Sequence, residues 1–188
     1  MPRSSRIESP GAYHHVTGRG LGELTLFPDD RARTVFLGML GEVVEAERWD
    51  VPAYCPLGTH YHLLVRSADA RLGKGLQRLH GRYAAWRNRS SARRGPVWAD
   101  RYHSVPILGA LHVARVVLYI DVNAVAAGIV AEPFDWQWSS ARANAGMDTP
   151  LDWHRPDLAR TFFGTESAAE YRSVLKREAE TLGRLSAG

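Results

Sequence analysis

The sequence predicts an α+β fold, with helices packed on one face of a β-sheet. Short segments rich in β-branched and aromatic residues alternate with long stretches whose apolar residues recur at helical spacing. Strands that alternate with helices are typical of a layered sandwich around one core. The chain of 188 residues is 45% hydrophobic, which is enough to bury such a core.

Four segments are predicted strands, because each is rich in strand-forming residues and is bounded by turn residues. They comprise residues 12–18, 51–55, 60–66 and a strand within 97–108. The short run 24–27 is predicted as a further strand edge.

Three long helices are predicted between and after these strands. The first begins with the acidic pair that follows Pro28 and ends near Trp49, with apolar residues at helical spacing between them. The second spans about 70–89, and the third runs from about 111 to 127, where Gly128 stops it.

Composition divides the chain into three parts. Residues 1–11 form a polar N-terminal tail, and residues 12–146 contain the predicted strands and the three long helices. Residues 147–188 follow a tryptophan-rich loop and are predicted to form a C-terminal helical appendage.

The composition favours a cytoplasmic protein. Cys55 is the only cysteine, so no intrachain disulfide can form. No apolar run approaches the roughly 20 residues of a membrane helix. The first ten residues lack the apolar core of a signal peptide. We therefore expect no membrane partner.

Positive charge is carried almost entirely by arginine. The net charge is +4, and only Lys74 and Lys176 are lysines. The planar guanidinium group suits bidentate contacts to phosphate. On the predicted helix 70–89, Lys74, Arg78 and Arg82 follow one another at four-residue steps. A charged helix face is usually solvated surface, and a nucleic-acid contact is the alternative.

The segment THYHLLV, residues 59–65, carries two histidines separated by one tyrosine. Successive side chains of a strand point to opposite faces, so His60 and His62 share one face. They are either solvent-facing residues of a half-buried strand or a pair aimed at one metal ion. The residues alone leave both interpretations open.

The third predicted helix has a polar stripe beside its apolar one. Arg115, Tyr119 and Asn123 follow at four-residue steps and therefore share a face. Pointed at the histidine pair, this face would supply a nucleophile, a metal ligand and a phosphate contact. A tyrosine at such a boundary is more often a packing residue.

Three further histidines receive the ordinary interpretation. His14 and His15 lie on the first strand, where one faces inward and one outward, and we expect hydrogen-bonded polar residues rather than ligands. His103 is expected on the surface.

Several segments follow one another in a characteristic order. They read PGAYHHVTGRG, THYHLLV, GLQRLHGRYAAWRNR, VWADRYHS, LYIDVN and FDWQWSSARA. In this order and spacing they resemble the IS200-like transposases, single-tyrosine HUH enzymes, and among them the REP-associated tyrosine transposases. The resemblance extends over most of the chain, makes residues 12–146 the transposase domain, and implies a ferredoxin-like sheet.

The resemblance also implies a chemistry. The protein would cleave and rejoin single-stranded DNA next to hairpins, through a 5′-phosphotyrosine link to Tyr119. His60, His62 and Asn123 match the positions that hold a divalent cation, Mg²⁺ or Mn²⁺. The expected partner is single-stranded or hairpin DNA, the expected state a monomer or homodimer, and the expected location the cytoplasm, in association with the nucleoid.

Arginine and exposed aromatic residues would supply the DNA contacts. The cationic side chains expected at the DNA are Lys74, Arg78, Arg82, Arg89, Arg93, Arg94, Arg101 and Arg115. Trp98, Tyr102 and Trp136 are candidates for base stacking, although burial is the usual place of a tryptophan.

Two departures from the family pattern leave rival functions open. Leu57–Thr59 replaces the usual Met-Pro-Asn turn, and Ala124 replaces a proline, which should let the third helix continue to Gly128. A diverged copy that binds hairpin or single-stranded DNA without catalysis is the first alternative. The second is a metal-dependent phosphoesterase for nucleotides, which needs a general base such as Asp100 or Asp121.

Overall fold

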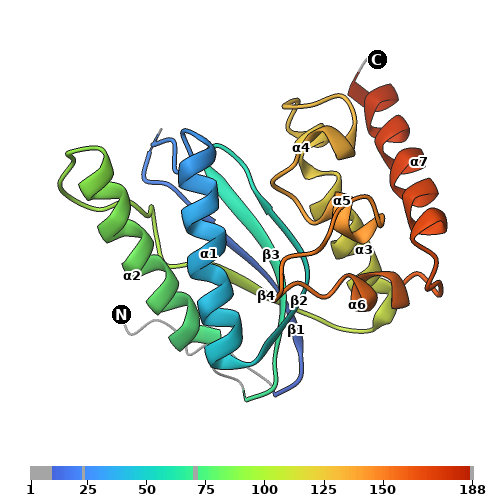
Figure 1. Cartoon of the computed structure of the whole chain (residues 1–188), viewed down its shortest axis with the longest axis horizontal. Helices are drawn as coiled ribbons and strands as arrows, with labels where there is room; N and C mark the ends of the chain where they lie inside the picture. Colours follow the sequence, from blue (N-terminus) through green and yellow to red (C-terminus); the bar gives the residue numbers. More distant parts are fainter. Residues whose placement is uncertain (1–9, 23, 70–71, 187–188) are drawn as a thin grey trace.

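The computed structural model describes residues 10–22, 24–69 and 72–186, and its α+β secondary structure agrees with the predicted class (Figure 1). Residues 1–9 of the predicted tail and residues 70–71 of the second predicted helix lie outside this range. The strands are β1 (Tyr13–Arg19), β2 (Trp49–Pro56), β3 (His60–Ser67) and β4 (His103–Ile107).

The helices fall into two long ones near the N-terminus and a series after β4. They are α1 (Asp30–Glu47), α2 (Leu72–Ser90), α3 (Ala110–Asp121), α4 (Asn123–Ala126), the 3₁₀ helix η1 (Pro133–Asp135), α5 (Ala141–Asn144), α6 (Pro156–Thr161) and α7 (Ala168–Ser186). No helix of the described chain is both long and apolar enough to cross a membrane.

The four strands form one antiparallel sheet in the order β2-β3-β1-β4. A helix follows β1 and another follows β3, so the chain runs β-α-β-β-α-β and has the ferredoxin-like arrangement. β1 and β3 lie in the centre, and their register sets Thr17 opposite His62 and His15 opposite Leu64.

Helices cover both faces of the sheet. α1 and α2 pack on one face, over a core that includes Val16, Tyr61 and Leu63. This layer is the one predicted from the sequence, with helices packed on one face of the sheet. α3 and the C-terminal helices cover the other face, over Ala53 and Leu64 (Figure 1). The second layer is needed because β2 and β3 carry apolar side chains on both faces.

The run 24–27 is not a strand, so its predicted strand edge is wrong. Leu26 and Phe27 are fully buried, but their backbone groups find partners outside the sheet. The Phe27 N–H donates to the carbonyl of Gly58 at 3.0 Å, and the Tyr83 hydroxyl donates to the carbonyl of Leu26 at 2.8 Å. An apolar loop is stable here because these bonds replace a strand ladder.

The third predicted helix is interrupted at Val122, so the expectation of a continuous helix to Gly128 is also wrong. Val122 has φ −95° and ψ 3°, α3 ends before it, and α4 begins after it. Alanine at 124 removes the steric reason for a break, yet the break falls directly after Asp121, the last residue of α3.

Asp121 is buried and accepts hydrogen bonds from three side chains. Asn144 Nδ2 and the Tyr171 hydroxyl donate to its Oδ2 at 2.8 Å and 2.7 Å, and the Ser140 hydroxyl donates to its Oδ1. Burial raises the pKa of Asp121 to about 6, although the three donors favour its ionised form. The carboxylate therefore joins the end of α3 to α5 and α7.

Replacing Tyr171 with phenylalanine should lower the free energy of unfolding by about 1.5–3 kcal/mol, because a hydrogen bond to a buried carboxylate is lost. The folded pKa of Asp121 lies above its ordinary value of 3.8. The contribution of this group to the free energy of unfolding therefore falls as the pH rises through the interval from 3.8 to about 6. Tyr171 favours the ionised form, so the deficit of Tyr171→Phe should be larger above this interval than below it.

Urea unfolding on both sides of the interval measures this difference. The matched control is Tyr119→Phe, since Tyr119 is 46% exposed whereas Tyr171 is fully buried. Equal deficits at both pH values would contradict the assignment.

Candidate active site

β3 places two imidazoles side by side on the face that α3 covers. The rings of His60 and His62 have centroids 5.0 Å apart and stand at 81° to each other. His62 is buried, whereas His60 is partly exposed and its Nδ1 lies 3.1 Å from the hydroxyl of Thr59. The predicted pair therefore shares one face of the sheet.

α3 carries Tyr119 to this pair within the same chain. The Tyr119 ring stands edge-on to His62, with centroids 5.3 Å apart and the planes at 89°. Val117 and Ile120 are fully buried against the sheet, and Tyr119 follows at the border between this core and solvent. The helix thus holds the phenol against the imidazoles while leaving it 46% exposed.

His15 belongs to the same group, which the sequence interpretation missed. Its ring is stacked near that of His62, with centroids 5.2 Å apart, and lies 5.7 Å from that of Tyr119. His15 Nε2 and His62 Nδ1 are 3.0 Å apart and form a hydrogen bond. The signal was the strand pairing, which puts His15 and His62 on one face. We call His15, His60, His62 and Tyr119 the His–Tyr cluster.

The imidazoles of the cluster are neutral at neutral pH. Burial, followed by the neighbouring His15 and His60, lowers the pKa of His62 to about 3. Burial, followed by His103, lowers the pKa of His15 to about 4. Burial and then Arg19 lower the pKa of His60. Each ring therefore carries one N–H and one lone pair.

The hydrogen bonds select one tautomer of His62. Its Nε2 is buried and has no hydrogen-bond partner. If His62 Nδ1–H donates to His15, this buried Nε2 carries a lone pair. The other arrangement leaves a buried N–H unpaired, which native proteins rarely tolerate. His15 therefore keeps the lone pair of His62 on Nε2, as the partners of metal-binding histidines do.

The other two residues of the predicted helix face are separated by the break. Arg115 is exposed on α3, one turn before Tyr119, and borders a shallow hollow of about 460 Å³. Asn123 is buried as the first residue of α4. It therefore follows Tyr119 by one turn, as expected, but across the break at Val122 rather than along one continuous helix.

Most of the predicted DNA-contact residues lie away from the His–Tyr cluster. Those on α2, the helix over the opposite face, are Lys74, Arg78, Arg82 and Arg89. Arg82 forms an ion pair with Glu42 at 2.5 Å. Arg93 and Arg94 are exposed in the turn after α2, and Arg101 is exposed before β4.

The two carboxylates proposed for a hydrolytic site, Asp100 and Asp121, do not belong to the His–Tyr cluster. Asp121 is fully engaged by donors from the C-terminal part of the chain, so its role is structural. Asp100 lies in the segment between α2 and β4. Among the described residues, no group of three or more His, Cys, Asp or Glu side chains is arranged to hold a metal ion.

The fold is similar to that of a solved nucleic-acid enzyme. A structure of a REP-associated tyrosine transposase bound to a REP hairpin matches with a TM-score of 0.67, over 81% of this chain and 91% of that chain. The sequences are 17% identical, so the likeness concerns the fold. No protein-family model matches the sequence, and no curated protein is significantly similar to it.

The tautomer of His62 can be tested without metal or DNA. Long-range ¹H–¹⁵N NMR of the metal-free protein should show an unprotonated Nε2 and a protonated Nδ1 for His62. Leaving a buried donor unpaired costs about 1–3 kcal/mol, so this tautomer should dominate by roughly fivefold or more.

Two substitutions of His15 separate its hydrogen bond from its volume. His15→Gln keeps an acceptor oxygen and should preserve the tautomer, whereas His15→Leu should abolish the preference. A protonated Nε2 in the wild-type protein would refute the proposed role of His15.

Proposed function

We propose that the protein is a metal-dependent DNA transposase and endonuclease. It cleaves single-stranded DNA next to hairpins and rejoins it through a 5′-phosphotyrosine intermediate. The observation that carries this proposal is the contact of Tyr119 with His62 and His15 within one chain. The likeness of the fold to a hairpin-bound tyrosine transposase supports it.

The residues of the cluster fit a divalent cation. The buried Nε2 of His62 has no partner in the protein, and a cation would satisfy its lone pair. His60 uses its Nδ1 for Thr59, which leaves its Nε2 for the same ion. The amide of Asn123 would be the third ligand. Imidazole ligands suit Mn²⁺ better than the harder Mg²⁺, so we expect the tighter binding with Mn²⁺.

When bound, the cation would polarise a non-bridging phosphate oxygen and neutralise the charge that develops at phosphorus. The protein itself supplies the nucleophile and its orientation. The Tyr119 hydroxyl must lose its proton as its oxygen attacks phosphorus. Its half-exposed ring leaves space for a phosphate to approach.

The reaction conserves its phosphodiester bonds. The Tyr119 oxygen forms a bond to phosphorus, the bond from phosphorus to the 3′ oxygen breaks, and that oxygen leaves and takes up a proton. In the reverse direction a DNA 3′ hydroxyl attacks the phosphotyrosine and restores the phenol. Rejoining therefore needs no nucleotide cofactor.

One chain is sufficient for this chemistry in our proposal. Tyr119 and both histidines come from the same subunit, with the ring centroids of Tyr119 and His62 5.3 Å apart. A partner subunit is not required to deliver the nucleophile. A monomer would therefore be active, and a homodimer would contain two independent sites. The place of action would be the cytoplasm, at the chromosomal hairpins of the nucleoid.

Incubation with a labelled hairpin that carries a single-stranded flank, in Mn²⁺, should give a covalent protein–DNA adduct on a denaturing gel. Tyr119→Phe should abolish the adduct, because the nucleophilic oxygen is gone. His62→Ala should reduce the rate by at least about a hundredfold, since even the loss of a residue that only hydrogen-bonds to a metal ligand costs roughly 10–100-fold.

The control is Tyr13→Phe, a partly buried tyrosine of β1 outside the cluster, which should form the adduct normally. Mass spectrometry of the digested adduct should place the nucleotide on Tyr119. Hairpin binding without any adduct would instead favour the non-catalytic binding protein. Cleavage of mononucleotides that survives Tyr119→Phe would favour the phosphoesterase.

A further inference from the structure

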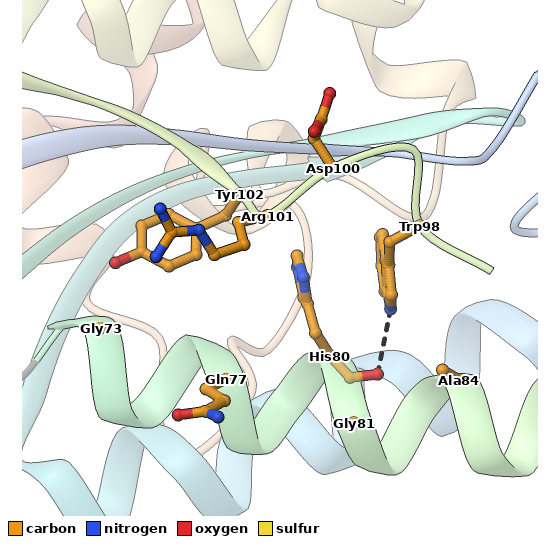
Figure 2. A pocket seen from close by; sticks show the side chains of 9 residues that line it. All are labelled: Gly73, Gln77, His80, Gly81, Ala84, Trp98, Asp100, Arg101 and Tyr102. Carbon is orange, nitrogen blue, oxygen red and sulfur yellow. Dashed lines mark hydrogen bonds between the residues drawn. The ribbon is translucent and has the colours of Figure 1, made fainter. Parts of the chain in front are cut away.

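A second hollow lies on the α2 side of the sheet, away from the His–Tyr cluster. It has a volume of about 640 Å³ and opens between α2 and the segment 98–102 that leads into β4 (Figure 2). Its floor is one face of α2, where small residues leave room. The floor residues are Gly73, Gln77, Gly81 and Ala84.

Two flat rings form a wall of this hollow. The rings of His80 and Trp98 are parallel within 7°, with centroids 3.8 Å apart. Trp98 Nε1 donates to the His80 carbonyl at 3.0 Å, and His80 Nε2 forms a hydrogen bond of 2.9 Å with Tyr61. Tyr102 stands edge-on to His80. Because hydrogen bonds already hold both stacked rings, a ligand would not have to order them.

Polar groups gather on the side of His80 that faces away from Trp98. Figure 2 shows the amide of Gln77 and the guanidinium of Arg101 on this side, whereas the carboxylate of Asp100 points away from the ring. An amide offers a donor and an acceptor, as the edge of a nucleobase requires. Arg101 is exposed, and its planar guanidinium suits a phosphate or a stacked base.

Arg101 is the cationic side chain among the residues that line the hollow, and Lys74 and Arg78 are exposed elsewhere on α2. Arg82 is less free, because Glu42 holds its guanidinium. An aromatic wall, an amide and the guanidinium of Arg101 together match a nucleotide, which combines a flat ring with an anionic phosphate.

We propose that this hollow, lined by Gln77, His80, Gly81, Trp98 and Arg101 and here called the base pocket, binds an unpaired nucleobase from the single-stranded flank of the hairpin. The inference rests on the proposed function, since it assumes a single-stranded DNA substrate. It adds a recognition site on the sheet face opposite the nucleophile. The base pocket would bind a base of the single-stranded flank while the His–Tyr cluster cleaves the strand.

Gly81 allows the base pocket to be blocked without disturbing the fold. A Cβ atom at Gly81 would meet no atom within 4 Å, so a larger side chain grows into the open hollow. Replacing glycine in a helix also favours the helical state. Gly38 on α1 is exposed and equally open, but it lies outside the pocket. Gly81→Leu and Gly38→Leu are therefore a matched pair.

The test measures binding of two labelled DNAs, a hairpin with a single-stranded flank and the same hairpin with a blunt end. Gly81→Leu should bind the flanked hairpin at least about tenfold more weakly, because base stacking on an aromatic wall is lost. Its affinity for the blunt hairpin should be unchanged. Gly38→Leu should behave as wild type with both DNAs.

An abasic scan identifies the base in the pocket. Removing one base of the flank should weaken binding to the wild type by a similar factor, and it should have no further effect on Gly81→Leu. Gln77→Ala, at an exposed position, should weaken binding of the flanked hairpin in the same way. It replaces Gly81→Leu as the test variant if Gly81→Leu unfolds at a lower temperature than wild type.

Equal binding of the flanked hairpin by Gly81→Leu and wild type would overturn the base pocket. An equal loss for both DNAs would overturn it as well. If wild type forms the Tyr119 adduct in either case, the proposed function stands and only the pocket falls. If wild type neither binds these DNAs nor forms an adduct, both proposals fall.

Discussion

The antiparallel pairing of β1 with β3 is the constraint on which the candidate site depends. It sets Thr17 opposite His62 and brings His15, on the same face, against the His62 ring. A shift of one residue in either strand would turn its histidines into the opposite core. Close packing resists such a shift, since a Cβ at Gly18 would lie 2.5 Å from the ring of Tyr61. The backbone ladder thus positions the imidazoles before any ligand is present.

The second constraint is the helix that carries Tyr119, the proposed nucleophile, and it depends on the C-terminal helices. α3 packs on the sheet through Val117 and Ile120, and its last residue, Asp121, is held by Ser140, Asn144 and Tyr171. Tyr119 lies two residues before this anchor. The C-terminal segment therefore stabilises the helix that presents Tyr119.

Much of this architecture can be predicted from the sequence because it follows from local periodicity. The shared face of His60 and His62 follows from the two-residue repeat of a strand, and the position of Tyr119 at a core border from the spacing of a helix. The role of His15 and the break at Val122 do not follow from the pattern of their own segments. The first depends on which strands pair, and the second lies next to a carboxylate that finds its donors in residues 140–171. The sequence around His15 does not identify β3 as its neighbour, and the sequence around Asp121 does not identify its three donors.

In the proposed complex, the β4 edge of the sheet would give one DNA strand a route to both faces. The β2 edge is covered, because His154 pairs with Val51 and the Arg155 N–H donates to the carbonyl of Val51 at 3.1 Å. The β4 edge is short and largely exposed, and it contains Pro106, a residue that sheets accept mainly at edges. Residues 98–102 border the base pocket, and the strand that follows them pairs with β1 beside His15. A strand that passes over this edge would therefore meet the pocket on one face and the His–Tyr cluster on the other. The distance between the recognised base and the cleaved bond would then be set by the width of one edge strand.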